Sequence, residues 1–369
     1  MSNLNDLVKS LNQVEDIRRT ECGNFKHSLP SVIASAFCAT MAGCTGYRSI
    51  SHFIEDNLVL LNANVGLLHG VPSPDTIRRV LTAADPQVLA DIFRKWAGID
   101  KLEPKYLQTD GKSVRASKED GEKTVHIVTV YASDFAASLL EEQVFDKENE
   151  ISAFERILLA NKINFSGKCV TGDAMFCQKS FCTAITQSGG DWIFVLKKNH
   201  PNLFADVQEY FDGTKGLETK VVNISGHGRQ VTKTIRFTTD VDWILKDYAF
   251  TGLSSMAEMT TEVLEKGKRT TSKQYLIGSV KTLEELFISR TKHWSIESMH
   301  WILDMAFDED HCLCRKGNSP LNLNIFRKIT HFLFSLAKKE KQYKGHSEKD
   351  LTRRCMTSFT HIRNSFSKP

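Results

Sequence analysis

The sequence lacks the long apolar runs, paired cysteines and internal repeats that define several large classes of protein. No apolar stretch in its 369 residues approaches the roughly 20 residues that a transmembrane helix requires. Residues 1–20 alternate charged and aliphatic positions, unlike the charged start and apolar middle of a signal peptide. We therefore expect a cytoplasmic protein without a membrane partner.

The nine cysteines are scattered, and no two of them form a CxxC pair. An odd number without paired spacing indicates reduced thiols rather than a disulfide framework. The nearest approach to a metal cluster is "HCLC" at residues 311–314, which has no second ligand pair at the spacing of a zinc site. We expect neither disulfide bonds nor bound zinc.

What is present is an ordinary globular composition with an uneven distribution of charge. The hydrophobic content is 41%, the charged content is 25%, and the net charge is only +4. Residues 311–369 nevertheless contain 13 Lys and Arg against 3 Asp and Glu, whereas residues 101–310 contain 26 against 31. A basic segment beside an acidic centre suits a metal-dependent enzyme that acts on a polyanion. A solvated basic tail is the alternative that charge alone leaves open.

The pattern over residues 1–98 predicts short helices joined by tight turns. Ser73 or Asp75 can cap a helix whose first turn carries Pro74, and a second helix is expected to start after Asp85-Pro86. Arg78 and Arg79 follow just inside the N-terminal end of that helix. We predict a helical N-terminal domain that binds DNA through these arginines. Helical bundles of this size also serve as protein–protein modules, so the alternative stays open.

Residues 104–199 carry strand and helix patterns in the order β-β-β-α-β-α-β. The first strand, in "KYLQTDGK", is expected to end at Asp110, and the fourth, in "GKCVTGDAM", at Asp173. Mixed sheets place their chemistry at strand ends, where loops leave room for a substrate. We therefore predict an α/β fold with a mixed-sheet core and two aspartates at one edge.

Residues 200–285 are rich in strand and turn patterns, and we predict a β-rich insertion subdomain there. His227 and Arg229 lie in a Gly-flanked turn of this insertion. They are candidates for DNA contact, although an ordinary hairpin tip would look the same. Residues 286–340 are expected to return to the core, and residues 341–369 to form a basic C-terminal tail.

The segment 290–312 predicts a helix with a polar stripe. His293, Glu297, His300 and Asp304 recur at intervals of four, three and four, which places them on one side of a helix. The rest of the helix surface is largely apolar. We expect the large aromatic residues of this region and of the last core strand to be buried: Trp192, Trp294 and Trp301.

Three carboxylates stand out by position: Asp110, Asp173 and Glu297. Two follow strands and one lies on the helix stripe, so a sheet covered by that helix can bring them together. Three converging carboxylates do not all stay ionised unless cations neutralise them. Hard oxygen ligands suit Mg²⁺ or Mn²⁺. Two such ions, about 3.5–4 Å apart, would serve phosphodiester chemistry.

Four motifs in their order along the chain resemble the DDE transposases of bacterial insertion sequences, in particular the H-repeat-associated, ISAs-type group. They are "TDGKSVR", "TGDAMFCQKSF…GGDWIFVLKKNHPNL", "HGRQ" and "RTKHWSIESMHWILDMAFDED". The N-terminal "PSPDTIRRVL" also resembles the helical segment that precedes the catalytic domain in this group. The likeness runs from about residue 15 to residue 340, and several ordered motifs are more specific than one short pattern.

The resemblance implies an RNase-H-like catalytic core, made of residues 104–199 and 286–340 and interrupted by the β insertion. It implies that Asp110, Asp173 and Glu297 bind two metal ions, with Asp110 bridging both. It also implies double-stranded DNA as the partner, as terminal inverted repeats and as target, and a homodimer in a nucleoid-associated transposition complex. Strand cleavage would be followed by attack of a 3′-hydroxyl on target DNA.

Several basic residues lie beside the predicted site in the sequence and are candidates to contact phosphate. One follows the first aspartate, two end the last core strand, and two precede the glutamate on its helix. They are Lys112, Lys197, Lys198, Arg290 and His293.

The helix departs from the pattern of some related transposases. Those with a β insertion carry Tyr, Arg, Glu and Lys at intervals of three, four and seven, where this chain has Arg290, His293, Glu297 and Asp304. An aspartate cannot replace a lysine that binds DNA, so we do not carry over the hairpin route of excision. Two alternatives to an active transposase stay open: a domesticated nuclease and a catalytically inactive DNA-binding protein.

Overall fold

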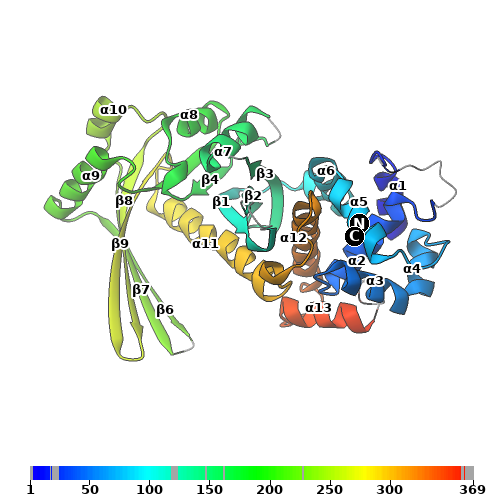
Figure 1. Cartoon of the computed structure of the whole chain (residues 1–369). Coiled ribbons are helices and arrows are strands. Elements are labelled where there is room, and N and C mark those ends of the chain that lie inside the picture. Colours follow the sequence, from blue (N-terminus) through cyan, green and yellow to red (C-terminus); the bar gives the residue numbers. More distant parts are fainter. Residues whose placement is uncertain are drawn as a thin grey trace.

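The computed structural model describes residues 3–16, 18, 25–117, 124–145, 148–160, 163–226, 228–358 and 361. Helices from both ends of the chain lie together in one half of the molecule, and a large twisted sheet with its covering helices forms the other half (Figure 1). None of the helices in these ranges is both long enough and apolar enough to cross a bilayer.

Six α-helices lie in the described residues before β1, and we call this part of the molecule the N-terminal half. Ser28, Ser73 and Asp85 cap α2, α5 and α6 by accepting hydrogen bonds from backbone N–H groups, and each cap is followed by proline in the first turn. Every residue of α2 is buried, because the other helices surround it. The bounds are α1 Leu4–Leu11, α2 Leu29–Met41, α3 Tyr47–Asp56, α4 Leu58–Val65, α5 Pro74–Ala83 and α6 Pro86–Ala97.

The other half is built on one nine-stranded sheet with the order β3-β2-β1-β4-β5-β9-β8-β7-β6. β1 pairs antiparallel with β2 and parallel with β4, and β5 is parallel to β4. The strands of the predicted core are β1 Tyr106–Val114, β2 Val125–Ala132, β3 Ala137–Val144, β4 Cys169–Gly172 and β5 Asp191–Leu196. The predicted fold class, an α/β mixed-sheet core of RNase-H-like strand order with a helical N-terminal region, is confirmed.

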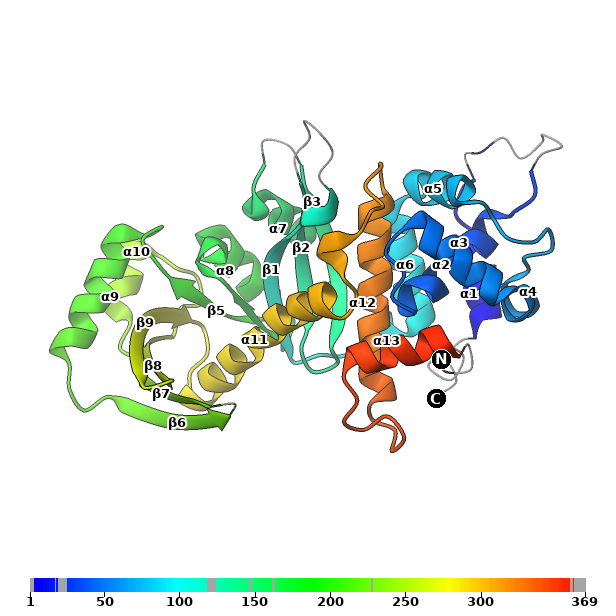
Figure 2. The same ribbon diagram turned by 60° about the horizontal axis from the view of Figure 1, so that its bottom comes forward.

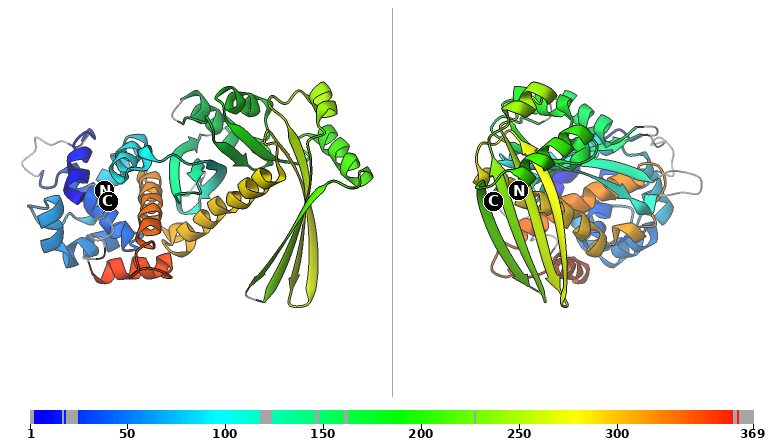
Figure 3. Two further views of the ribbon diagram at one scale, coloured as in Figure 1. Left: turned by 180° about the vertical axis from the view of Figure 1, so that it is seen from behind. Right: turned by 90° about the vertical axis from the view of Figure 1, so that its left-hand side faces the viewer.

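The region after β5 extends this sheet. It contains α9 Pro201–Gly213, β6 Glu218–Gly226, β7 Arg229–Thr238, α10 Asp242–Tyr248, β8 Ser255–Glu265 and β9 Lys268–Gly278. β9 pairs with β5 over Ile193–Leu196, so these strands continue the core sheet rather than forming a sheet of their own. Figure 3 shows the far ends of β6 to β9 projecting from the molecule, and we call these four strands the ribbon.

Helices cover both faces of the core sheet. On one face α7 Glu150–Leu159 and α8 Lys179–Gln187 bury Phe154 and Phe181 against strand residues. On the other face α11 Leu283–Met305 crosses β1, β4 and β5 and also touches β6 and β7 (Figure 2). The face under α11 therefore receives side chains from the core strands, the ribbon and one long helix.

The two last helices join the N-terminal half. α12 Ser319–Ala337 packs on α2, α5 and α6 as well as on β3, and α13 Glu348–Thr357 packs on α2 and α12. Residues 341–369 were expected to form a basic tail. Part of that segment is instead the helix α13, because Leu351 and Cys355 are buried in the helical core. The other predicted domain boundaries stay predictions.

Candidate active site

The strand register brings Asp110 and Asp173 to adjacent positions. β1 and β4 are parallel neighbours whose last paired residues are Thr109 and Gly172, and the two aspartates come next on their strands. A side chain at Gly172 would not fit, since its Cβ would lie 2.8 Å from Cγ2 of Thr109. The close approach of the two strands therefore requires glycine immediately before Asp173.

One detail of the sequence prediction is wrong. The first strand does not end at Asp110, because β1 continues to Val114 while it pairs with β2 up to Val125. β4 ends opposite Thr109, whereas β1 continues. Asp110 therefore has no paired residue on the β4 side. Asp173 does follow the end of its strand, where it precedes a short 3₁₀ turn at Ala174–Phe176.

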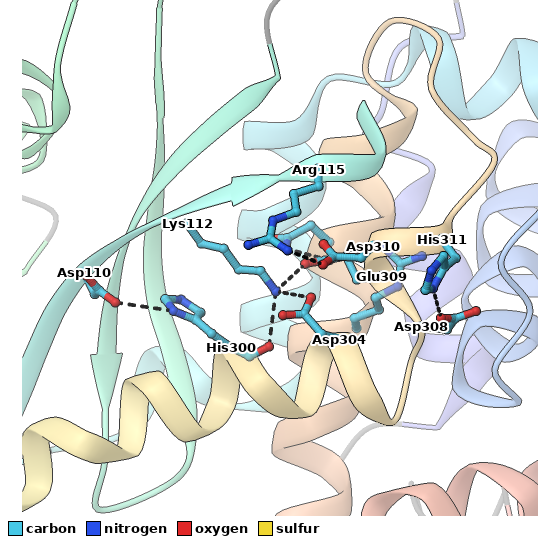
Figure 4. Close-up of polar contacts among 11 residues, drawn as sticks. Asp110, Lys112, Arg115, His300, Asp304, Asp308, Glu309, Asp310 and His311 are labelled. Carbon is cyan, nitrogen blue, oxygen red and sulfur yellow. Dashed lines mark hydrogen bonds and ion pairs between the residues drawn. The ribbon is translucent and has the colours of Figure 1, made fainter. Parts of the chain in front are cut away.

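α11 places its polar stripe over this pair of aspartates. The helix begins after Thr282, whose hydroxyl accepts from the backbone N–H of Glu285, and it buries Leu286, Ile296 and Met299. Nδ1 of His300 lies 3.4 Å from Oδ2 of Asp110 (Figure 4). The stripe of α11 thus faces the sheet and contacts it at Asp110.

The second histidine of the stripe faces the second aspartate. Nε2 of His293 lies 3.9 Å from Oδ1 of Asp173. Its other ring nitrogen, Nδ1, is 3.1 Å from Oγ1 of Thr171, which lies two residues before Asp173 on β4. Each aspartate is therefore bordered by one histidine from α11.

The surroundings of both histidines disfavour the protonated form. Burial lowers the pKa of His293 to about 3, and the nearby charge of Arg290 adds to this effect. Burial also lowers the pKa of His300, although Asp110 opposes it. Nε2 of His300 has no hydrogen-bond partner among the described residues, which places the proton of the neutral ring on Nδ1, toward Asp110. His300 can therefore donate from Nδ1 toward Asp110.

Glu297 lies between the two histidines on α11 and shares an electrostatic environment with both aspartates. Burial raises its pKa, Arg290 opposes the rise, and the charges of Asp110 and Asp173 add to it. A like charge raises the pKa of a carboxyl group only from nearby, so this effect indicates that Glu297 lies within electrostatic range of both aspartates. The three predicted carboxylates therefore lie within electrostatic range of one another where α11 crosses β1 and β4.

The chemistry of these donors suits a divalent cation. All three are hard carboxylate oxygens, which Mg²⁺ and Mn²⁺ prefer, and a cation would relieve their mutual repulsion. Within the part of the chain that the structure describes, no three acidic, histidine or cysteine side chains are spaced to hold a metal ion by themselves. The three carboxylates lie near one another, but they are not spaced as a complete set of ligands for one ion.

Arg290 is the buried cation of the site. It is 5% exposed, and its Nη2 donates to Oε1 of Gln274 at 3.4 Å. Its Nε and Nη1 find no hydrogen-bond partner among the described residues. Burial lowers its pKa, whereas the charges of Asp173 and Glu297 raise it. A buried guanidinium with unused donors beside carboxylates has capacity left for another anion.

Lys112 is held by carboxylates of its own. Its ammonium lies 2.6 Å from Oδ1 of Asp304 and 3.0 Å from Oε2 of Glu309, and it donates to the carbonyl of His300 at 3.2 Å (Figure 4). This accounts for Asp304, the residue at which α11 departs from the related pattern. A contact between Lys112 and phosphate stays a prediction, and it would require exchange of these ion pairs.

The other predicted DNA contacts lie on the loop after β5, on β7 and on α5. Lys197 and Lys198 are exposed in the loop after β5, and Arg229 is exposed at the start of β7. Arg78 and Arg79 lie on α5 and both pair with Asp75, at 2.5 Å and 2.6 Å. His227 lies outside the described residues. Their roles in binding DNA stay predictions.

Sequence reasoning missed two features of the site. Trp192 is buried as expected, but Trp294 is 45% exposed and Trp301 is 64% exposed, because α11 packs on the sheet along one side only. Lys233 of β7 was also overlooked, although it lies close enough to Arg290 and Glu297 to interact with both. The sequence signal that could have identified Lys233 is its position in a strand, two residues before the apolar Ile235.

Comparison with known proteins agrees with this picture. The family model described as "Transposase DDE domain" matches residues 104–333, and the model "DDE_Tnp_1-associated" matches residues 8–97. The "H repeat-associated putative transposase YhhI" of Escherichia coli K12 is 26% identical and covers 93% of both chains. The "Putative transposase YncI" of Escherichia coli O157:H7 is 27% identical over 88% of this chain and 86% of that one.

Among solved structures, the piggyBac transposase synaptic complex with hairpin DNA is a distant likeness. Its TM-score is 0.45 at 11% identity, over 99% of this chain and 78% of that chain. The sequence matches carry the assignment. They confirm the resemblance inferred from the motifs, and they imply an enzyme of the polynucleotidyl transferase or endonuclease kind that acts on DNA with divalent metal ions. The chain belongs to the DDE transposase family.

Proposed function

We propose that the chain is the cut-and-paste transposase of an insertion sequence. It cleaves DNA at the ends of the element and joins the resulting 3′-hydroxyl to target DNA, and Asp110, Asp173 and Glu297 are its metal ligands. The observation that carries the proposal is the strand register that sets Asp110 beside Asp173, with both aspartates close to the stripe of α11 that contains Glu297.

Asp110 would hold the ions together with Asp173 and Glu297, since it lies beside Asp173 on the neighbouring strand and close to α11. Two Mg²⁺ or Mn²⁺ ions, when bound, would activate water or a 3′-hydroxyl and stabilise the leaving oxygen. His300 is proposed to orient Asp110 from 3.4 Å, and His293, held by Thr171, lies 3.9 Å from Asp173 without a hydrogen bond to it. Such supporting contacts commonly set metal affinity.

Arg290 is proposed to bind a phosphate oxygen near the cleaved bond with the donors that the protein leaves unused. The exposed Lys197, Lys198 and Arg229, and the arginines of α5, are proposed to contact flanking phosphates. The DNA partners are the terminal inverted repeats of the element and a target duplex. A homodimer would hold two ends together for joining.

The test is an assay of cleavage and joining on duplexes that carry the inverted repeats flanking the chain's own gene. With Mg²⁺ the wild type should cleave these ends and transfer them to a plasmid, and Asp110→Asn should do neither. Asp308→Asn, a change of the same kind at a residue with an exposed side chain, is the matched control. Both variants should bind the duplex.

The outcomes separate three readings. Cleavage without joining would refute a transposase and support a transposase-derived nuclease. Binding of the repeats without cleavage by the wild type would refute an active enzyme in favour of a DNA-binding protein. Equal cleavage by Asp110→Asn and the wild type would refute the assignment of the site.

A further inference from the structure

Lys233 is carried to the candidate active site by the ribbon. On β7 it alternates with Ile235 and Phe237, which are buried in a cluster that includes Leu283 and Leu286 of α11. Residues two apart on a strand face the same side of the sheet. Lys233 therefore points toward α11, on the side of the sheet where the three carboxylates lie.

The base of the ribbon is seated firmly on α11. Lys220, on β6, forms an ion pair with Glu284, and its ammonium lies 4.4 Å from the centre of the Phe287 ring. β6 and β7 pair without a break: Lys220 pairs with Ile235, and Lys233, two residues before Ile235, pairs with Val222. Lys233 therefore lies in the part of the ribbon that packs on α11, not in its projecting end.

Lys233 lies over an aromatic face beside the catalytic glutamate of the proposal. Its ammonium is 5.4 Å from the centre of the Trp294 ring, a residue one turn before Glu297 on α11. Burial lowers the pKa of Lys233, the charge of Arg290 lowers it further, and Glu297 opposes both. The cation is thus partly removed from water and lies within range of both charged residues of the site.

No carboxylate holds this ammonium. Across the described ranges the ammonium of Lys233 makes neither a hydrogen bond nor an ion pair, whereas Lys112 has two carboxylate partners and Lys273 also has two. A partly buried ammonium without a counterion is unfavourable, and an anion that binds beside it gains from the lowered polarity. The site has an unused cation where a phosphate would approach Glu297.

We propose that Lys233 contacts a non-bridging oxygen of the scissile phosphate and is a catalytic residue of the cleavage step. It would supply from the ribbon the cation that α11 lacks at Asp304, which is committed to Lys112. The inference rests on the proposed function and deepens it. It makes the insertion part of the active site, since its β7 strand would deliver a side chain to the reacting group.

The experiment compares Lys233→Gln with Lys233→Arg in single-turnover cleavage of the inverted-repeat duplex. Lys233→Gln should slow cleavage about 100-fold, as removal of one charge-stabilising donor does in other enzymes, and Lys233→Arg should retain most of the rate. Lys273→Gln removes a lysine on β9, another strand of the same ribbon. This variant should cleave within about twofold of wild type. Equal melting temperatures would show that all three variants fold.

A binding measurement tests the phosphate contact directly. Without divalent ions, Lys233→Gln should reduce the salt dependence of duplex binding by a slope of about 0.9, the value for one phosphate contact. A neutral methylphosphonate at the scissile position should abolish the difference in affinity between wild type and Lys233→Gln. The same substitution several nucleotides away should leave that difference intact.

Two results would overturn the inference. If the wild type cleaves and Lys233→Gln cleaves at the same rate, Lys233 is a structural partner of Trp294 only. If the wild type does not cleave, the proposed function fails, and an unchanged salt slope in the binding arm then refutes the phosphate contact separately.

Discussion

Replacing Glu309 by glutamine tests the ion-pair network that holds the end of α11 against β1. The Glu309 side chain is fully buried, with Lys112 at 3.0 Å from Oε2 and Arg327 at 3.3 Å from Oε1. Asn324 donates to Oε1 at 2.9 Å. Glutamine has nearly the same shape, so the change removes the charge and leaves Lys112 and Arg327 as buried cations without their shared partner.

The size of the effect follows from the protonation equilibrium of Glu309. Burial alone would raise its pKa, but Lys112 and Arg327 outweigh burial and lower the pKa from 4.5 to about 2. A shift of that size corresponds to about 3 kcal/mol of stability at neutral pH. Breaking a buried ion pair typically costs about 3–5 kcal/mol, so the two routes agree.

The pH dependence has a definite sign. The folded-state pKa is lower than the unfolded one, so the stabilisation by Glu309 is complete above pH 4.5 and is lost as the pH falls toward about 2. Urea unfolding followed by circular dichroism should give Glu309→Gln a free energy of unfolding about 3 kcal/mol below wild type at pH 7. That difference should shrink between pH 4.5 and the acid limit.

The control is Asp308→Asn, one residue earlier, whose side chain is largely exposed and which should change stability by less than about 0.5 kcal/mol. The reasoning is refuted if Glu309→Gln is as stable as wild type at pH 7. It is also refuted if the deficit stays constant as the pH falls below 4.5, since another cause would then be responsible.

Other predictions concern the contacts of α11. His300→Phe should weaken activation of cleavage by Mg²⁺ about 10- to 100-fold in the metal concentration required, because Asp110 loses its neutral donor; an unchanged metal titration would show that His300 only packs. Trp192→Ala should lower the free energy of unfolding by about 3–5 kcal/mol, since its side chain is fully buried, whereas Trp301→Ala should change it by less than about 0.5 kcal/mol. If urea melts showed equal losses in the free energy of unfolding for the two variants, the exposure of Trp301 on α11 would be contradicted.

The sequence predicted the core elements because their signals are local. The helix signals at Ser73-Pro74 and Asp85-Pro86 correspond directly to α5 and α6. The continuation of β1 beyond Asp110 was missed because it depends on pairing with β2, a partner that the strand's own pattern does not reveal. The extent of a strand is decided by its neighbours.

The same distinction applies to the site. Asp110, Asp173 and Glu297 could be singled out from strand ends and helix spacing, together with the family resemblance. The partners of Lys112, and the approach of Lys233, could not, because they join residues about 60 to about 200 positions apart in the chain. Trp301 was expected to be buried from its residue type, but a helix that packs along one side leaves large residues exposed on the other.

The most direct test of the central claim is to measure metal binding and cleavage together in the complex with an element end. Electron paramagnetic resonance should count two Mn²⁺ ions bound by the wild type, with Asp110→Asn losing both and Glu297→Gln losing one. Each variant should also lose cleavage by at least about 1,000-fold. Unchanged Mn²⁺ binding and cleavage in Asp110→Asn or Glu297→Gln would contradict the claim that these carboxylates form the active site.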